Sequence, residues 1–352
     1  MSEKIFSNIQ SIITDAKKGK MFILVDDKNR ENEGDLVAPG SKCTSKVINF
    51  MAKHGRGLVC LALTKQQIDK LKLPLMSQIN KSRLQTAFAV SIEAKKGITT
   101  GISAFDRAKT IKVAINPKSK KTDIVSPGHV FPLVGRNGGV LERAGHTEAS
   151  IDISKLAKLN PSSVICEVMN EDGRMARLDD LVKFSKKHKI KIASIADLIS
   201  YRLKNEKLIY KIYSKKINLK NRSKYFLSIY KNMLNNDESF VFSSGLFKGN
   251  ISIPVRVLSK KINRLNLLKN KEIKKNLRIL SKFKNFVLVI INNEMNKKKK
   301  SETDMTLRYY GIGAQIIKDL NVKKMILLSR VKKKIIGLEG FGLKITKQII
   351  IK

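Results

Sequence analysis

The sequence predicts an α/β (α+β) protein with two domains, the first a mixed sheet covered by helices. Apolar residues recur along residues 5–18 at the spacing of one helix face, and Gly19 ends the pattern. Residues 57–64 instead form a nearly continuous apolar run, which is typical of a strand buried on both faces. Because strands and helices alternate until the composition changes near residue 205, we expect one domain at 1–205 and a smaller α+β domain at 206–352.

The same patterns place the other elements of the first domain. Helical periodicity predicts helices at 44–54, 106–114, 146–159, 178–188 and 195–203. Short apolar runs bounded by turn-forming residues predict strands at 20–25, 86–94, 163–168 and 190–194. Residues 127–145 contain five glycines and two prolines, so we expect irregular backbone there, where binding groups are often found.

The second domain is less clearly patterned and more basic. Its patterns predict strands within 240–257, a helix at 273–283 and a buried strand at 286–291, whereas residues 204–236 show little periodicity. Residues 201–352 hold 37 Lys and Arg against 9 Asp and Glu, and residues 1–200 hold 34 against 20. Positive charge can bind phosphate backbones. The surplus is mostly Lys scattered among many Ile and Asn, which indicates a bias in residue usage, so we expect no dedicated nucleic-acid binding.

Cysteine usage and the terminal sequence bear on the location of the protein. Cys43, Cys60 and Cys166 lie far apart, without the paired spacing of a disulfide framework or a thiolate zinc site. We therefore expect a reducing, cytoplasmic compartment and no zinc. The N-terminus lacks a signal-peptide pattern, and the longest apolar run, residues 286–291, is too short to span a bilayer, so we expect no membrane association.

An acidic stretch interrupts this basic chain at residues 26–35. Five of its ten residues are carboxylates: Asp26, Asp27, Glu31, Glu33 and Asp35. Apolar residues on both sides predict that the stretch forms a turn between two strands. Hard oxygen ligands suit Mg²⁺, which keeps several waters that a phosphorylated substrate can displace. The alternative is a solvated acidic turn, because runs of charge usually face water.

Two histidines are candidates for function. His129 and His146 bracket the glycine-rich segment, and each follows a glycine that lets the backbone approach a ligand closely. Histidine can transfer protons near neutral pH or, when neutral, bind a metal, so His146 with Glu31 would form a mixed nitrogen and oxygen site. His54 and His188, at predicted helix ends, are most simply structural.

Glu167 and two arginines complete the candidate chemistry. Glu167 is a lone carboxylate in an apolar strand, which requires a partner or a raised pKa suited to acid–base catalysis. Its alternative is a strand-end carboxylate that reaches solvent. Arg30 and Arg143 are candidates to bind a phosphate, since a guanidinium binds oxyanions through two parallel hydrogen bonds. These residues together indicate a metal-assisted acid–base enzyme acting on a small phosphorylated substrate.

Four motifs occur in order in the first domain. They are Asp-Asp-x-x-Arg-Glu-Asn-Glu-Gly-Asp (26–35), Gly-Ile-Thr-Thr-Gly-Ile-Ser-Ala-x-Asp-Arg-Ala (97–108), Pro-Gly-His-Val-Phe-Pro-Leu (127–133) and Gly-Gly-Val-Leu-Glu-Arg-Ala-Gly-His-Thr-Glu-Ala (138–149). They closely resemble 3,4-dihydroxy-2-butanone 4-phosphate synthase of riboflavin biosynthesis. With Glu167 in register, the resemblance covers about residues 3–203. Lys28, Asn29 and Ala89 depart from the family's usual residues.

This resemblance implies an activity and a set of site residues. The family converts D-ribulose 5-phosphate to 3,4-dihydroxy-2-butanone 4-phosphate and formate, which implies Mg²⁺ or Mn²⁺, two ions per active site, and a homodimer. Glu31 and His146 resemble its metal ligands, and His129 and Glu167 resemble its essential acid–base groups. The residues that match its substrate contacts are Arg30, Glu31, Asp35, Arg143, Ala144, Gly145, His146, Thr147 and Glu167.

The second domain resembles GTP cyclohydrolase II, as fused in bifunctional riboflavin enzymes. The resemblance is clearest at residues 307–316, 322–329 and 335–343. That enzyme needs three cysteine thiolates on zinc, and no cysteine follows Cys166. We therefore expect a degenerate domain, inactive as a cyclohydrolase, with a structural, docking or regulatory role. Two alternatives stay open: a bifunctional enzyme that retains GTP cyclohydrolase II activity through other zinc ligands, and a basic half that binds nucleic acid or protein.

Overall fold

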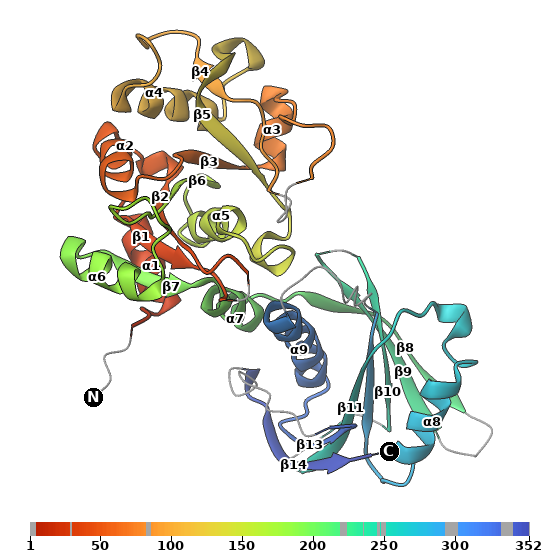
Figure 1. The fold of residues 1–352 in the computed structure, drawn as a ribbon. Helices are drawn as coiled ribbons and strands as arrows, with labels where there is room; N and C mark the ends of the chain where they lie inside the picture. Colours follow the sequence, from red (N-terminus) through yellow and green to blue (C-terminus); the bar gives the residue numbers. More distant parts are fainter. Residues whose placement is uncertain are drawn as a thin grey trace. The chain divides into compact units, whose positions relative to one another are not determined.

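The computed structural model describes most of the chain in two compact units, residues 1–199 and 200–352 (Figure 1). The described residues are 5–28, 30–81, 86–218, 224–234, 236–244, 247, 251–292, 302–331 and 341–351. Asn29, one of the departures from the family pattern, lies outside them, as do residues 335–340 of the cyclohydrolase-like motif.

Unit 1, residues 1–199, contains one mixed seven-stranded sheet in the order β4-β5-β3-β6-β2-β1-β7. β1 with β7 and β3 with β5 pair in parallel, and the other neighbours pair antiparallel. The strands are β1 (Phe22–Val25), β2 (Gly34–Pro39), β3 (Cys60–Thr64), β4 (Ile92–Ala94), β5 (Ile124–Gly135), β6 (Ser162–Glu167) and β7 (Lys191–Ser194). Every residue of β1 and β2 is buried, so this part of the sheet is covered on both faces.

Helices supply that cover (Figure 1). α5 (His146–Leu156) contacts β6, β3 and β2 and also packs on α1 (Ile9–Lys17). The other face forms a core in which Leu36 and Cys166 of the sheet cluster with Ile48 and Ile111 of the covering helices. The remaining helices are α2 (Ser45–Phe50), α3 (Lys65–Leu71), α4 (Ala104–Ile115), α6 (Leu178–His188) and α7 (Ile195–Asn205), which runs past the division between the units.

Side-chain caps determine where several helices begin. The Asn8 side chain accepts the N–H of Ser11 at 2.8 Å before α1, and Ser103 accepts that of Asp106 at 3.0 Å before α4. Each cap satisfies a donor that the first helical turn leaves without a partner. Ser103, within the motif at 97–108, therefore has a structural role as the N-cap of α4.

The mixed α/β fold is confirmed, with differences in detail. The expected irregular backbone at 127–145 is wrong for residues 130–135, because β5 pairs there with β3 and β4. Pro127 and Gly128, although within β5, lie in a register shift beside β4, where a strand tolerates such residues. The expected strand at 86–94 shortens to β4, and the helix expected at 44–54 is α2 followed by a π-helical turn, Met51–Gly55.

Unit 2, residues 200–352, holds a second seven-stranded sheet in the order β14-β13-β11-β12-β10-β9-β8. Its strands are β8 (Ile209–Asn218), β9 (Lys224–Asn232), β10 (Glu238–Ser243), β11 (Ser252–Ser259), β12 (Val287–Ile291), β13 (Lys324–Ser329) and β14 (Lys344–Ile350). Its helices include α8 (Lys271–Leu280), which packs against Phe240 and Leu288, and α9 (Glu302–Asp319). The β8–β9 hairpin lies where little periodicity was detected, because residues 210–216 are exposed and carry no buried face to mark the strand.

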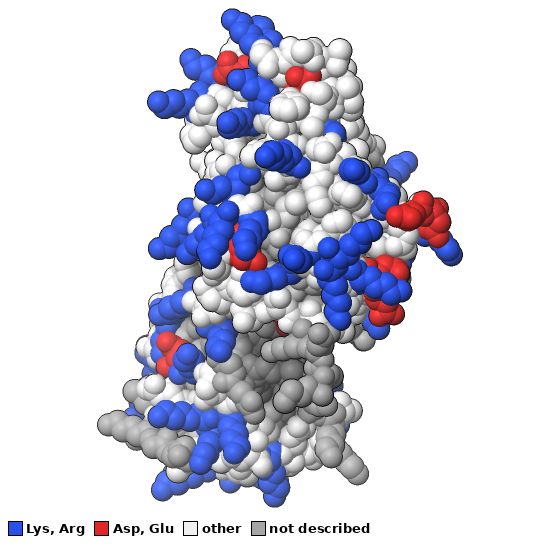
Figure 2. Space-filling view, turned by 90° about the vertical axis from the view of Figure 1, so that its left-hand side faces the viewer, with Lys and Arg blue, Asp and Glu red and all other residues white. Residues whose placement is uncertain are grey.

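The surface is basic over a wide area. Figure 2 shows Lys and Arg side chains scattered over the face in view, with few Asp and Glu among them. Among the described residues, no helix is both long enough and apolar enough to cross a membrane.

Candidate active site

The acidic turn between β1 and β2 folds around one buried carboxylate. The Asp26 side chain is 1% exposed, and its two oxygens accept the backbone N–H groups of Glu31 and Glu33, each at 3.0 Å. Arg30 Nη1 donates to the same carboxylate at 2.8 Å and also contacts Glu31. These bonds hold Glu31 in place by its own backbone, so its carboxylate is positioned before any ligand arrives.

His146 is the first residue of α5 and faces this turn. It is 7% exposed, and its Nδ1 lies 3.6 Å from Glu31 Oε2 and 3.8 Å from Asp35 Oδ1. Its other ring nitrogen, Nε2, is buried without a hydrogen-bond partner. A buried polar atom without a partner is costly, so this nitrogen has an unmet capacity to bind a ligand.

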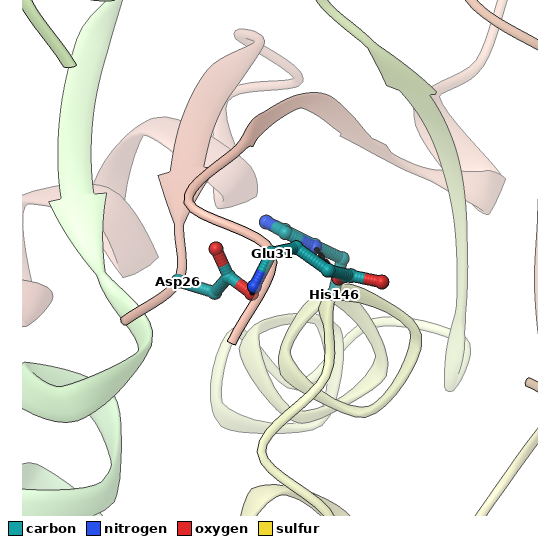
Figure 3. A group of neighbouring side chains, drawn as sticks. All are labelled: Asp26, Glu31 and His146. Atoms are coloured by element: carbon teal, nitrogen blue, oxygen red, sulfur yellow. Dashed lines mark hydrogen bonds and ion pairs between the residues drawn. The ribbon is translucent and has the colours of Figure 1, made fainter. Parts of the chain in front are cut away.

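Three side chains form a group with the composition of a metal site (Figure 3). Asp26, Glu31 and His146 each offer one ligand atom, and these atoms lie within 4.8 Å of one another. Asp26 and Glu31 come from the turn after β1, and His146 comes from the start of α5. Two carboxylates and an imidazole are suitable ligands for a divalent cation.

Asp35 and Glu167 are paired on neighbouring strands beside this group. They are opposite each other in the β2–β6 register, and Asp35 is 4% exposed. The Glu167 carboxylate accepts the N–H of Leu58 at 2.9 Å. Gly57 makes this approach possible, because a Cβ there would lie 2.5 Å from the Glu167 carbonyl oxygen and 2.7 Å from its carboxylate. Glu167 is thus held at the sheet end and does not simply extend into solvent.

The proximity of these charges shifts their pKa values. Burial alone would raise the pKa of Glu31, but His146 and Arg30 outweigh burial and lower it to about 2. Burial raises the pKa of Asp35 to about 7, although His146 opposes this. Burial would lower the pKa of His146, but Asp35 and Glu31 outweigh it and raise that pKa to about 9. Near neutral pH the site therefore holds a protonated ring between carboxylates.

The segment before α5 is held by acidic side chains of the same helix. Arg143 donates to Glu148 at 2.7 Å and to Thr86 Oγ1 at 2.9 Å. Asp152 accepts the N–H of Val140 at 2.8 Å. The predicted substrate-binding residues that follow Arg143, namely Ala144, Gly145, His146 and Thr147, are all buried. The structure therefore places this predicted segment at the start of α5, where His146 lies close to Glu31.

His129 lies apart from the Glu31–His146 pair. His129 lies two residues before Phe131 on β5, and Phe131 pairs with Cys60 of β3. Cys60 also pairs with Ile165 of β6, which lies two residues before Glu167. His129 and Glu167 are thus at the same end of the sheet with one strand between them, about 10 Å apart at a strand spacing of about 4.8 Å. Among the described side chains, His129 contacts Glu93 of β4.

Two residues of this arrangement were not assigned from the sequence. Asp26 was counted among the carboxylates of the turn but not as a ligand, although its place directly after a buried strand is where a fixed side chain would be expected. Glu93 had no assigned role. The sequence signal for Glu93 is that it is the single carboxylate in the apolar run that precedes the motif at 97–108.

Comparisons with known proteins identify the family. A family profile for 3,4-dihydroxy-2-butanone 4-phosphate synthase matches residues 10–201, and one for GTP cyclohydrolase II matches residues 268–350. Riboflavin biosynthesis protein RibBA of Aquifex aeolicus (strain VF5) is 44% identical, over 99% of this chain and 93% of the relative. The 3,4-dihydroxy-2-butanone 4-phosphate synthase of Photobacterium phosphoreum is 41% identical, over 97% of this chain and 99% of the relative.

Solved structures agree in fold. The crystal structure of RibBX, a two-domain 3,4-dihydroxy-2-butanone 4-phosphate synthase from A. baumannii, has a TM-score of 0.83 and 39% identity, covering 98% of this chain and all of that one. A 3,4-dihydroxy-2-butanone 4-phosphate synthase in complex with two magnesium ions has a TM-score of 0.54 and 36% identity, covering 57% of this chain and 98% of that one.

Fold and comparisons define an enzyme of riboflavin biosynthesis with a GTP cyclohydrolase II-like second part. The chain belongs to the 3,4-dihydroxy-2-butanone 4-phosphate synthase family.

Proposed function

We propose that unit 1 converts D-ribulose 5-phosphate to 3,4-dihydroxy-2-butanone 4-phosphate and formate at the site formed by the acidic turn and the start of α5. The observation that carries this proposal is the group of Asp26, Glu31 and His146 beside the Asp35–Glu167 pair. The two products together contain all atoms of the substrate, so the reaction needs no oxidant or reductant. Proton transfer and charge stabilisation are what it requires, and the site is rich in groups for both.

Glu31 and His146 would hold Mg²⁺ or Mn²⁺, with Asp26 as a third group. The buried His146 Nε2 without a partner and the mixed oxygen and nitrogen donors fit a divalent cation. The relative solved in complex with two magnesium ions supports binding of a divalent metal, and we propose two ions per site. When bound, the metal would polarise the hydroxyl and carbonyl oxygens of the sugar. Arg30 is itself held by Asp26 and Glu31, so it would bring positive charge to the edge of this group.

The other residues would bind substrate and move protons. Arg143 to Thr147 lie at the amino end of α5, where unpaired N–H groups and the helix dipole favour an anionic phosphate. Asp35 can exchange a proton near neutral pH, since its pKa is about 7. Glu167 and His129, at the same end of the sheet, would serve as acid–base groups on either side of the sugar carbons. The deep burial of Asp35 and His146 would keep bulk water away from the reacting atoms.

Formate release tests this proposal directly. The purified full chain, given ribulose 5-phosphate and Mg²⁺, is expected to release one formate for each butanone phosphate formed. Glu167→Gln should lose most of this turnover while its thermal unfolding stays cooperative, because the amide cannot exchange a proton in the same way. A folded, metal-loaded wild-type chain that releases no formate would refute the proposal.

Unit 2 is proposed to be inactive as a GTP cyclohydrolase II, with the domain division near residue 205. Residues 200–352 contain neither cysteine nor histidine, so a zinc site of the usual sulfur and nitrogen ligands cannot form there. Residues 254–259, within β11, resemble the start of the zinc motif, but Lys260 and Lys261 follow where its ligand-bearing segment should begin. Lys260 pairs with Glu272 at 2.8 Å, and Arg330 pairs with the same glutamate at 2.9 Å. We propose a structural, docking or regulatory role for this unit in place of zinc-dependent catalysis.

A homodimer is proposed for unit 1. Ile102, Phe105 and Val125 are large apolar residues with exposed fractions of 54%, 76% and 41%. They belong together, because Val125 pairs with Glu93 and Gly101 lies against the same glutamate. Exposed apolar residues grouped in this way mark interaction surfaces. Sedimentation should show a dimer that Phe105→Asp weakens, and a monomeric wild-type chain at micromolar concentration would contradict this.

A further inference from the structure

We infer that Glu93 is a positioning residue that fixes the imidazole of His129 for proton transfer. The inference rests on the function proposed above for His129, and it extends the site to β4. The catalytic histidine of an acid–base enzyme must present one defined ring nitrogen to the substrate, and a carboxylate on the other nitrogen is the usual means of ensuring this.

His129 and Glu93 are in direct contact. His129 Nδ1 bonds to Glu93 Oε1, and the Glu93 side chain is 15% exposed while that of His129 is 45% exposed. An ionised carboxylate can only accept hydrogen bonds, so Nδ1 must donate. Nε2 is then the nitrogen free to exchange a proton. The less exposed Glu93 holds the ring, and the more exposed His129 remains accessible to a substrate.

Two glycines create the space that Glu93 occupies. A Cβ on Gly101 would overlap the Glu93 carboxylate, and a Cβ on Gly128 would lie 2.5 Å from Glu93 Cγ. Gly101 also has a φ of +92°, a conformation that side chains disfavour. Gly101 comes from the motif at 97–108, and Gly128 directly precedes His129. Two sequence motifs that are distant along the chain thus meet at one carboxylate.

The backbone around the pair is tied down on both sides. Ser126 Oγ donates to the Ser91 carbonyl at 2.7 Å, and the Gly128 N–H donates to Ser91 Oγ at 3.1 Å. Asp106 accepts the N–H of Gly101 at 3.1 Å and so fixes the turn above Glu93. A rigid surround is what a positioning contact needs, since a loosely held carboxylate would not restrict the ring.

A substitution without an acceptor tests the inference. Glu93→Met has a similar length but cannot accept the Nδ1–H. We expect kcat for formate release to fall at least about tenfold, and by no more than the about 10²–10⁴-fold that an acid–base group contributes, while KM changes less than about twofold. Glu93→Asp should recover part of the lost kcat. Glu171→Met, the same change at a carboxylate whose side chain is 86% exposed, should leave both constants unchanged.

The ring tautomer gives a readout that does not depend on activity. Nitrogen-15 NMR of histidine-labelled protein should show the neutral His129 ring protonated at Nδ1 in the wild type and mainly at Nε2 in Glu93→Met. If the wild type releases no formate, the proposed function fails, but this spectrum still decides whether Glu93 holds the ring. An unchanged tautomer together with an unchanged kcat would overturn the inference.

A second variant covers the case in which Glu93→Met does not fold. Glu93→Gln keeps the shape of the side chain, but a neutral amide stabilises a positively charged ring less well than a carboxylate does. A lower kcat with unchanged KM is expected in this variant too. The amide oxygen of Gln can still accept the Nδ1–H, so the tautomer must be read together with kcat. A kcat equal to that of the wild type in a folded Glu93→Gln protein whose neutral His129 ring is protonated mainly at Nε2 would contradict a positioning role.

Discussion

His146 Nδ1 lies 3.6 Å from Glu31 Oε2, although the two residues are 115 positions apart in the chain. The contact joins the turn after β1 to the first residue of α5, and Asp26 holds the turn in place through two backbone hydrogen bonds. Because neither segment could present both ligands alone, the metal site that we propose depends on the packing of α5 against β2.

Removing the carboxylate of Glu31 should abolish metal binding and turnover. In Glu31→Gln the amide is a much poorer cation ligand than the carboxylate. Loss of the metal should raise the activation free energy by several kcal/mol, which corresponds to a fall of roughly a thousandfold in kcat. Calorimetric titration with Mg²⁺ and the formate assay check this. Asp69→Asn, which removes one exposed carboxylate from an ion pair with Lys65, is the matched control and should bind metal normally. Normal Mg²⁺ affinity in Glu31→Gln would contradict the ligand assignment.

Metal binding should release a proton from His146. The carboxylates of Asp35 and Glu31 overcome the effect of burial and raise the pKa of the ring to about 9, so the ring is protonated at pH 7. A metal binds the neutral ring, so the proton must leave and the apparent Mg²⁺ affinity should rise between about pH 7 and about pH 9. Titration in two buffers of different ionisation enthalpy should reveal about one proton released at pH 7. Equal heats in both buffers would show that none is.

Gly57→Ala should impair catalysis through Glu167. The new Cβ would lie 2.5 Å from the Glu167 carbonyl oxygen and 2.8 Å from its nitrogen, so backbone must shift because no rotamer relieves the clash. Overpacking of this kind costs about 1–3 kcal/mol of stability, and we expect a lower kcat in the protein that still folds. Gly313→Ala is a suitable control, since its Cβ would meet Ile291 at an ordinary 3.4 Å. Wild-type kcat in a folded Gly57→Ala protein would show that Glu167 need not stay in place.

Unit 2 should bind no stoichiometric zinc and turn over no GTP. The ligands of such a site are missing from residues 200–352, which have neither cysteine nor histidine. Elemental analysis of the purified chain and a GTP hydrolysis assay with added Zn²⁺ check this together. Stoichiometric zinc accompanied by product formation from GTP would restore the bifunctional alternative.

Much of the fold and of the candidate site could be predicted from the sequence, because hydrophobic periodicity and short motifs are local patterns that indicate them. The helical spacing of 5–18 and the apolar run of 57–64 each correspond to an observed element, α1 and β3. The four motifs also place the acidic turn and the start of α5 in one predicted site, and the two segments are in contact in the structure. These features depend on residues that lie close together in the sequence.

The remaining features depend on partners that no local pattern reveals. β5 continues through Pro132 because β3 pairs with it there, and tertiary pairing outweighs the turn-forming tendency of this residue. The contact between Glu93 and His129 joins different strands, so neither residue alone signals it. Arg30 was expected to face a phosphate, and only the structure shows that Asp26 and Glu31 already hold it.

An isotope experiment tests the central claim most directly. Ribulose 5-phosphate labelled with carbon-13 at C4 should be given to the full chain with Mg²⁺, and the products followed by carbon NMR. We expect the label to appear in formate, whereas a label at C1 should stay in the phosphorylated product. Label from C4 remaining in the phosphorylated product, or no formate from the folded and metal-loaded chain, would contradict it.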